Sequence, residues 1–216
     1  MSEALHNAAR KGNLAALISF LDSNENKTID LDLPNSWART PLYLAARNCH
    51  EDMVRALIDR GAKVNFSTQK GTALDAAARW GHERIASILI EHGAKVNVDA
   101  DKSNHDSALH VAAQFGHVRV AAVLIEHGAH LNRPGQYSDT PLECARYEDH
   151  KQVESLLENA MKRREHMRLI SLAILLKPLG LPVLALYTVY RSILQYRAHP
   201  VARHHAWDVL KRLKQN

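Results

Sequence analysis

Hydrophobic and polar positions follow a helical period along most of this 216-residue chain, and the pattern returns at regular intervals. Within one segment, Ile85, Ile88 and Leu89 fall at i, i+3 and i+4, which is the spacing of a helix with one buried face. Four similar stretches are TPLYLAARNCH (40–50), TALDAAARWGH (72–82), SALHVAAQFGH (107–117) and TPLECARYEDH (140–150), and a degenerate copy, ALHNAARKGN, lies at 4–13. The pattern therefore predicts a repeated pair of helices.

Each copy carries its own start and stop signals. Thr or Ser before the apolar segment is an N-cap residue, and Pro at the first helical position has a fixed φ that suits a helix. Paired alanines such as Ala77-Ala78 allow close packing, and Gly81 and Gly116 are expected to end the first helix in the left-handed conformation. A second apolar helix follows and ends at Gly61, Gly93 or Gly128. No single unit can bury its apolar face alone, so we expect the units to stack.

The T-P-L start, the alanine pair, the Gly-His step and the G-A-x-x-N ending occur in register several times. In these features the chain resembles the ankyrin repeat over roughly residues 3–160. The resemblance implies an all-α ankyrin-repeat solenoid of about five helix pairs with projecting hairpin loops. Two departures are Cys49 and Asp149, which stand where the family has glycine. About three extra residues precede Ser107, so we expect one loop to protrude.

The resemblance also implies a non-catalytic adaptor that binds a protein partner through its concave surface. The family's loop and first-helix positions fall here on Trp37, Arg39, Arg47, Arg79, Trp80, Gln114, Phe115, Tyr137 and Tyr147. Exposed aromatics beside arginine are typical of interface hot spots, and Trp80 and Phe115 share one column and are expected to be neighbours. The alternative is that Arg47 and Arg79 only bridge adjacent repeats.

Charge along this surface is expected to change sign. Arg39, Arg47 and Arg79 belong to the first half of the repeats, and the acidic residues Asp106, Asp139 and Glu148 belong to the second. A partner with the opposite polarity would be favoured.

The net charge of +5 hides a division of the chain into two parts. Residues 1–160 contain 17 Lys and Arg against 21 Asp and Glu, and residues 161–216 contain 11 against 2. We therefore predict an ankyrin-repeat domain at 1–160 and a basic, apolar helical extension at 161–216. An anionic membrane or an acidic partner would suit the extension. Nucleic acid is not favoured, because its basic residues alternate with large apolar ones.

The extension contains a long apolar run at 169–190, interrupted by the breaker KPLGLP (177–182). The helix that ends before this breaker, together with the segments at 183–196 and 201–216, predicts about three C-terminal helices. The run would be covered by the last repeat, by a membrane entered as a hairpin over 165–198, or by a partner's groove. Its expected docking residues are Leu172, Leu176, Leu181, Leu184 and Tyr187. A divergent ubiquitin-ligase box in the same region is a further adaptor hypothesis.

Motifs of catalysis and metal binding are not found in the sequence. The G-H histidines His50, His82, His117 and His150 recur one repeat apart and do not converge, and His199, His204 and His205 have loose spacing. Cys49 and Cys144 form no CxxC pair, and residues 1–13 do not have the pattern of a secretory signal. We therefore expect a cytoplasmic protein without catalytic activity, cofactor, metal or small-molecule substrate, with membrane association as the alternative.

Overall fold

All regular elements in the described part of the chain are helices. The computed structural model describes residues 2–23, 29–97 and 106–176. Its helix pairs are α1 (Ser2–Lys11) with α2 (Leu14–Asp22), α3 (Pro41–Arg47) with α4 (Glu51–Asp59), α5 (Ala73–Trp80) with α6 (Glu83–Glu91), α7 (Ala108–Gln114) with α8 (Val118–Glu126), and α9 (Pro141–Tyr147) with the first turns of α10 (Lys151–Leu176). The all-α repeat prediction is confirmed here, whereas the helices expected at 183–196 and 201–216, and the extra residues before Ser107, lie outside the described ranges.

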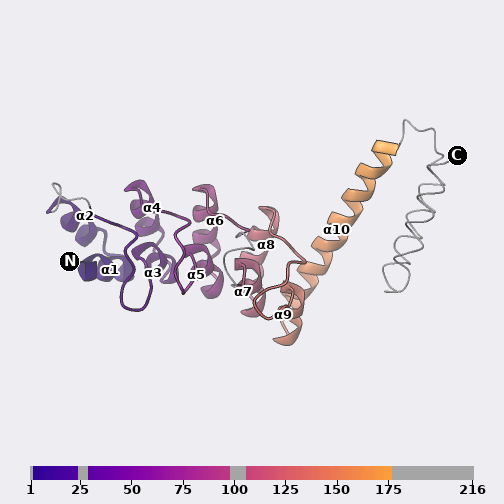
Figure 1. Ribbon diagram of the computed structural model, residues 1–216, viewed down its shortest axis with the longest axis horizontal. Coiled ribbons are helices and arrows are strands. Elements are labelled where there is room, and N and C mark those ends of the chain that lie inside the picture. The colour runs from indigo at the N-terminus through magenta and orange to yellow at the C-terminus, as the bar shows by residue number, and fades with distance from the viewer. Residues whose placement is uncertain (1, 24–28, 98–105, 177–216) are drawn as a thin grey trace. The chain divides into compact units, whose positions relative to one another are not determined.

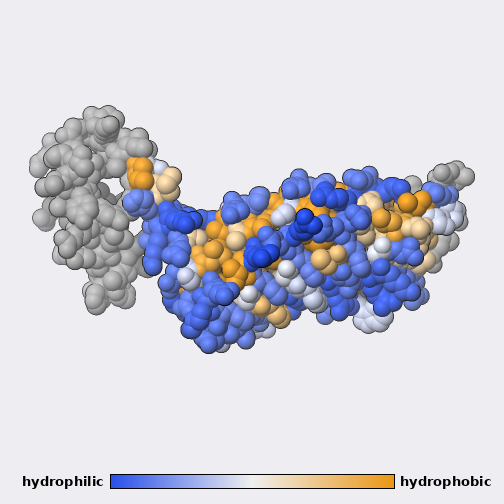
Figure 2. Space-filling model, turned by 180° about the vertical axis from the view of Figure 1, so that it is seen from behind, coloured by the Kyte–Doolittle hydropathy of each residue, from blue (hydrophilic) through white to orange (hydrophobic). Residues whose placement is uncertain are grey.

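The helices of the repeat part stack in two rows (Figure 1). Each first helix packs on the next, from α1 to α9, and the second helices α2, α4, α6 and α8 pack on one another in the same order. The core lies between the rows, where Leu57, Leu89 and Leu109 are almost completely buried. Burial of one such leucine contributes about 2 kcal/mol. On the side shown in Figure 2, apolar patches alternate with hydrophilic side chains.

The predicted start signals are formed as expected. The hydroxyl oxygens of Thr40, Thr72 and Thr140 accept the backbone N–H three residues on, at 3.1, 3.2 and 3.3 Å. The paired alanines, Ala45, Ala46, Ala77, Ala78, Ala112 and Ala113, have no exposed surface. Small side chains at these positions therefore let neighbouring first helices approach closely.

The turn between the two helices of a repeat uses the left-handed conformation in all five copies that the structure describes, with Gly12 at a φ of 68° in the first. Gly81 and Gly116 have φ of 74° and 72°. Cys49 and Asp149 keep the same turn with φ of 60° and 57°, although they carry a Cβ. The two departures from the repeat pattern therefore change the strain of the turn and not its shape.

The G-H histidines tie each repeat to the one before it. The Nε2 atoms of His50, His82, His117 and His150 lie 3.1, 2.9, 3.0 and 3.0 Å from backbone carbonyl oxygens of the preceding first helix. Those carbonyls belong to Arg10, Arg47, Arg79 and Gln114. A carbonyl can only accept, so Nε2–H donates in each bond. The recurring histidines are thus inter-repeat contacts, in agreement with their spacing.

The asparagine of the G-A-x-x-N ending makes a second inter-repeat contact. Asn65 accepts the backbone N–H of Lys95 at 2.7 Å and donates to the carbonyl of Gly93 at 2.9 Å. Asn97 repeats the arrangement with His130 and Gly128 at 2.8 and 3.0 Å. Both polar ends of each amide are therefore used to hold the next repeat in register.

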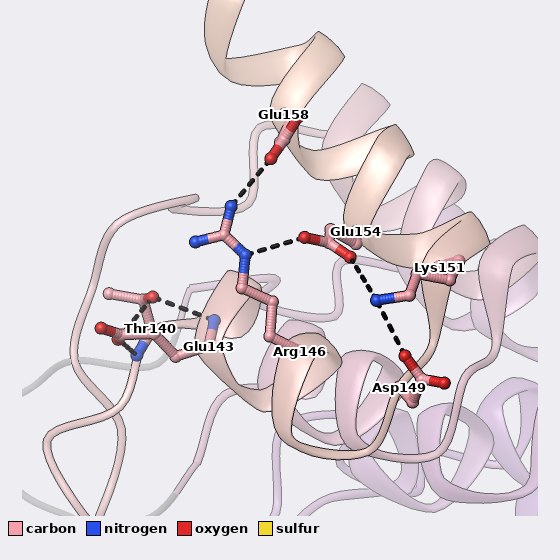
Figure 3. Close-up of polar contacts among 7 residues, drawn as sticks. All are labelled: Thr140, Glu143, Arg146, Asp149, Lys151, Glu154 and Glu158. Atoms are coloured by element: carbon pink, nitrogen blue, oxygen red, sulfur yellow. Dashed lines mark hydrogen bonds and ion pairs between the residues drawn. The ribbon is translucent and has the colours of Figure 1, made fainter.

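The last first helix is held by ion pairs (Figure 3). Arg146 of α9 donates from Nε to Glu154 and from Nη2 to Glu158 on α10, both at 2.8 Å. Lys151 lies 2.8 Å from Asp149 and 3.5 Å from Glu154. Arg146 occupies the column that holds Ala46, Ala78 and Ala113 in earlier repeats. The long side chain is accommodated because it turns toward α10.

The chain divides into two units, Met1–Ala160 and Met161–Asn216. Within the second unit, the described residues are the C-terminal part of α10, where Met167 and Ile170 are 61% and 41% exposed. Of the helices in the described ranges, none combines the length and the apolarity needed to cross a membrane.

Candidate functional site

A pocket of about 620 Å³ lies at the N-terminal end of the first-helix row. Residues of α1, of the loop 34–39 and of α3 line it: Glu3, His6, Asn7, Arg10, Pro34, Asn35, Ser36, Trp37, Arg39, Leu44 and Arg47. We call it the Arg39 pocket. Three of the sequence-predicted residues, Trp37, Arg39 and Arg47, therefore share one cavity.

The loop that carries Trp37 is shaped by Asn35. The Asn35 side-chain oxygen accepts the backbone N–H groups of Trp37 and Arg39 at 3.0 and 3.1 Å. The backbone then turns through Ala38, which has a φ of 54°. This turn leaves the indole of Trp37 67% exposed. His6 fixes the base of the loop, since its Nε2 donates to the carbonyl of Leu33 at 2.9 Å.

Two arginines of the first-helix row lie over aromatic rings of the following repeat. The guanidinium carbon of Arg47 is 4.9 Å from the centre of the Trp80 ring, and that of Arg79 is 4.9 Å from the centre of the Phe115 ring. These distances are within the range of cation–π attraction. The arginines therefore bridge repeats, as the alternative interpretation held, and lie at the same time beside the predicted aromatic residues.

Trp80 and Phe115 differ in exposure. Trp80 is half-buried and meets the buried ring of Tyr43 edge-on, with the ring centres 6.5 Å apart. Phe115 is 41% exposed and stacks on His117 at 6.4 Å. Each ring thus has an arginine and an aromatic neighbour, and the ring contacts found among the described residues do not include a direct pair of Trp80 with Phe115.

Tyr43 marks the basic end of the surface. Burial raises the pKa of its hydroxyl above the ordinary value, and the positive charges of Arg39, Arg79 and Arg47 act against that shift. All three guanidinium groups therefore act on this one hydroxyl. Asp75 acts on the same hydroxyl in the direction that burial does.

Cys144 marks the acidic end. Burial raises the pKa of its thiol to about 11, and the charges of Asp106 and Asp139 act in the same direction. Tyr137 and Tyr147 are 77% and 76% exposed in this half. Acidic residues of the second half therefore act on this half-buried thiol, and the change of charge sign along the whole surface stays a prediction. Gln114 contacts the next repeat through its backbone carbonyl.

Sequence reasoning missed three residues of this surface. Arg10 lines the Arg39 pocket and stands in the same column as Arg47 and Arg79, so the degenerate first copy contained the signal. Tyr43 is itself buried and contributes to the surface through its edge-on contact with Trp80. Arg146 stands where earlier copies have the second alanine, and its ion pairs with α10 do not follow from that column.

The remaining predicted docking residues cannot be placed. Leu172 and Leu176 belong to α10, but their side chains lie outside the described set, and Leu181, Leu184 and Tyr187 lie in the undescribed range 177–216. The membrane and ubiquitin-ligase hypotheses for these residues therefore stay predictions. Within the described ranges, no group of three or more His, Cys, Asp or Glu side chains could hold a metal ion, and His199, His204 and His205 fall outside those ranges.

Comparison with known proteins gives the same repeat architecture. The family model for ankyrin repeats (three copies) matches residues 5–100 and 97–165. One similar protein is alpha-latrotoxin-Lg1a of Latrodectus geometricus, 44% identical over 61 residues, which is 28% of this chain and 4% of that protein. Another is ankyrin repeat domain-containing protein 29 of Danio rerio, 36% identical over 69 residues, which is 32% of this chain and 22% of that protein. The similarity therefore covers a small part of each relative.

Proposed function

Because this chain belongs to the ankyrin-repeat family, a family of protein–protein interaction modules, we propose that it is an adaptor that binds a protein partner through the first-helix row and its loops. The binding surface comprises Trp37, Arg39, Arg47, Arg79, Trp80, Gln114, Phe115, Tyr137 and Tyr147. Its proposed location is intracellular, and no catalytic step is assigned to it.

The observation that carries the proposal is the pairing of arginine with aromatic rings on one row. Arg47 over Trp80 and Arg79 over Phe115 repeat the same geometry one repeat apart. A guanidinium held on a ring is pre-organised, so it loses less conformational freedom when a partner binds. Arginine and aromatic residues are also the types enriched among interface hot spots.

The exposed rings indicate that the surface is made for contact. Trp37, Tyr137 and Tyr147 are each at least two-thirds exposed, and all three belong to loops or to the end of a first helix. The partner that fits would present acidic groups toward the α1–α5 end and basic groups toward the α9 end, because the charges of this chain are expected to change sign in that direction.

Affinity capture with the full chain tests the proposal. The double variant Trp37→Ala/Phe115→Ala should lose the proteins that the wild type retains, because both side chains are exposed and their removal leaves the core intact. Ile18→Ala is the matched control, since Ile18 is 44% exposed on α2, in the other row. Circular dichroism checks that each variant folds. Equal capture by all three proteins would contradict the proposed surface.

A second candidate is association with an anionic membrane through residues 165–198. Met167 and Ile170 are exposed on α10, and Arg163 and Arg168 beside them are exposed as well. Apolar and basic side chains together favour anionic lipid surfaces. Sedimentation with phosphatidylserine-containing vesicles, and not with neutral vesicles, would support this role. Sedimentation unchanged by Met167→Ser/Ile170→Ser and by removal of 177–216 would contradict it.

A further inference from the structure

We propose that the Arg39 pocket takes an aspartate or glutamate side chain from an extended segment of the protein partner. This inference rests on the proposed function and adds the chemistry of the segment that is bound. The pocket is large enough for one side chain and part of the neighbouring residue, since its volume is about 620 Å³. It is built by three separate pieces of chain, α1, the loop 34–39 and α3.

Three arginines line the pocket, Arg10, Arg39 and Arg47, against one acidic residue, Glu3. Arg10 donates to Asn7 at 3.4 Å, and Arg47 lies over the Trp80 ring. Within the described ranges, none of the three arginines forms an ion pair. Elsewhere in the repeats, Arg84, Arg119 and Arg146 pair with acidic residues of a neighbouring element. The pocket therefore keeps a positive charge that the chain does not neutralise locally.

Arg39 supplies the specific donor. Its Nε atom is buried and has no hydrogen-bond partner among the described residues. A buried donor without an acceptor costs free energy, and nearly all such groups in folded proteins have partners. A carboxylate in the pocket would accept this N–H once the Arg39 side chain turns it toward the pocket, and it would align with the planar guanidinium. Binding would thus satisfy a group that folding leaves unsatisfied.

Two neighbours narrow the chemistry of the occupant. Glu3 lines the same pocket, so the occupant meets one negative charge as well as the three arginines. The indole of Trp37 is 67% exposed beside the pocket and offers apolar area to the residue next to the acid. The bound segment is therefore an acidic residue adjacent to a large apolar one.

Selection from a phage library of random nine-residue peptides on the immobilised full chain tests this inference. We expect the selected peptides to share an Asp or Glu beside an apolar residue. Replacing that acid by Gln or Asn should weaken binding of the tightest peptide about tenfold or more, because a charge-assisted hydrogen bond is lost. Arg39→Gln should weaken the acidic peptide to the same degree and leave the amide peptide unchanged.

Arg84→Gln is the matched control, since Arg84 lies on α6 in the other row, and it should bind the acidic peptide as the wild type does. If Arg39→Gln does not fold, Arg10→Gln serves, because Arg10 is exposed on α1. Peptides without a shared acid, failure to select any peptide, equal binding by Arg39→Gln, or tighter binding of a phosphoserine peptide would each overturn the inference. A further outcome separates the two proposals. If Trp37→Ala/Phe115→Ala loses the captured partner and Arg39→Gln keeps it, the inference about the pocket is overturned and the proposed function is not.

Discussion

The guanidinium carbon of Arg79 lies 4.9 Å from the centre of the Phe115 ring. Arg79 belongs to α5, and Phe115 is the C-cap residue of α7, so the contact joins two consecutive repeats. Arg47 and Trp80 form the same contact one repeat earlier. One pair of side chains thus links two repeats while leaving part of its surface open to a partner.

The Arg79–Phe115 contact predicts energetic coupling. In a double-mutant cycle with Arg79→Gln and Phe115→Leu, the free energies of unfolding should be non-additive by about 0.5–1 kcal/mol, the usual size of an exposed cation–π interaction. Urea unfolding followed by circular dichroism measures it. Arg55→Gln on α4 replaces Arg79→Gln in the control cycle, which should be additive. Coupling no larger than that of the control would contradict an energetic role for the contact.

His110 predicts a pH dependence of stability. Its Nδ1 accepts from the Ser107 hydroxyl at 2.7 Å and the Ser107 N–H at 3.2 Å, and Nε2–H donates to the carbonyl of Arg133 at 2.9 Å. Burial lowers the pKa of the ring below 6.5. The hydrogen bond to the Arg133 carbonyl and the charge of Asp106 act in the opposite direction, but burial has the larger effect. The unfolded chain therefore binds a proton more readily, and stability falls as the pH drops through 6.5 toward the folded-state pKa.

The variant His110→Gln isolates this effect. Urea unfolding between about pH 7.5 and about pH 5.5 should show a steeper loss of stability for the wild type than for the variant, because the variant has no ring to protonate. His110→Gln will be less stable overall, since the buried cap bonds change, so the slope with pH is the informative quantity. Parallel slopes would contradict a neutral, buried His110.

The two cysteines should react at very different rates. The pKa of Cys144 is about 11, so only about 0.1% of its thiol is ionised at pH 8, and thiolate is the reactive form. Cys49 is exposed, whereas Cys144 is half-buried. Iodoacetamide at pH 8 should therefore modify Cys49 first, as peptide mass spectrometry would show. The variant Cys49→Ser should remain largely unmodified on the same timescale, and rapid modification of Cys144 in it would refute this expectation.

Arg146 predicts salt-sensitive stability. The 2.8 Å bond from Arg146 Nε holds the pKa of the Glu154 carboxyl below the ordinary range, with a smaller contribution from Lys151, and a second 2.8 Å bond joins Nη2 to Glu158. Arg146→Ala should lower the thermal midpoint at low ionic strength, and the difference from wild type should shrink in about 1 M NaCl because exposed charges are screened. The control Arg55→Ala removes a charge for which no ion pair is found among the described residues. An equal, salt-independent effect of both variants would contradict the role of the ion pairs.

Sequence periodicity was sufficient for the repeats because each rule acts within a few residues. Thr72 caps its helix through an atom three residues away, and Gly81 ends the helix through its own φ. The location of Trp37, Arg39 and Arg47 around one cavity could not be predicted in the same way. It depends on α1, which comes from the degenerate first copy. Arg10 of α1 occupies the position that Arg47 has in the second copy, but the residues around it differ from those of the other copies. A pocket of this kind arises from packing between residues far apart in the sequence. The position of a residue within its repeat predicts that it can line a pocket, but not which residues line one together.

Arg146 has a consequence for how an array like this one could change in length. Every earlier member of its column is an alanine without exposed surface, which leaves room for the first helix that follows. Arg146 instead places a long side chain in this column, which extends to Glu154 and Glu158. A duplicated unit could be inserted between α8 and α9 with the existing side chains, whereas growth after α9 would first require this arginine to become small. One residue thus determines the direction in which the array can expand.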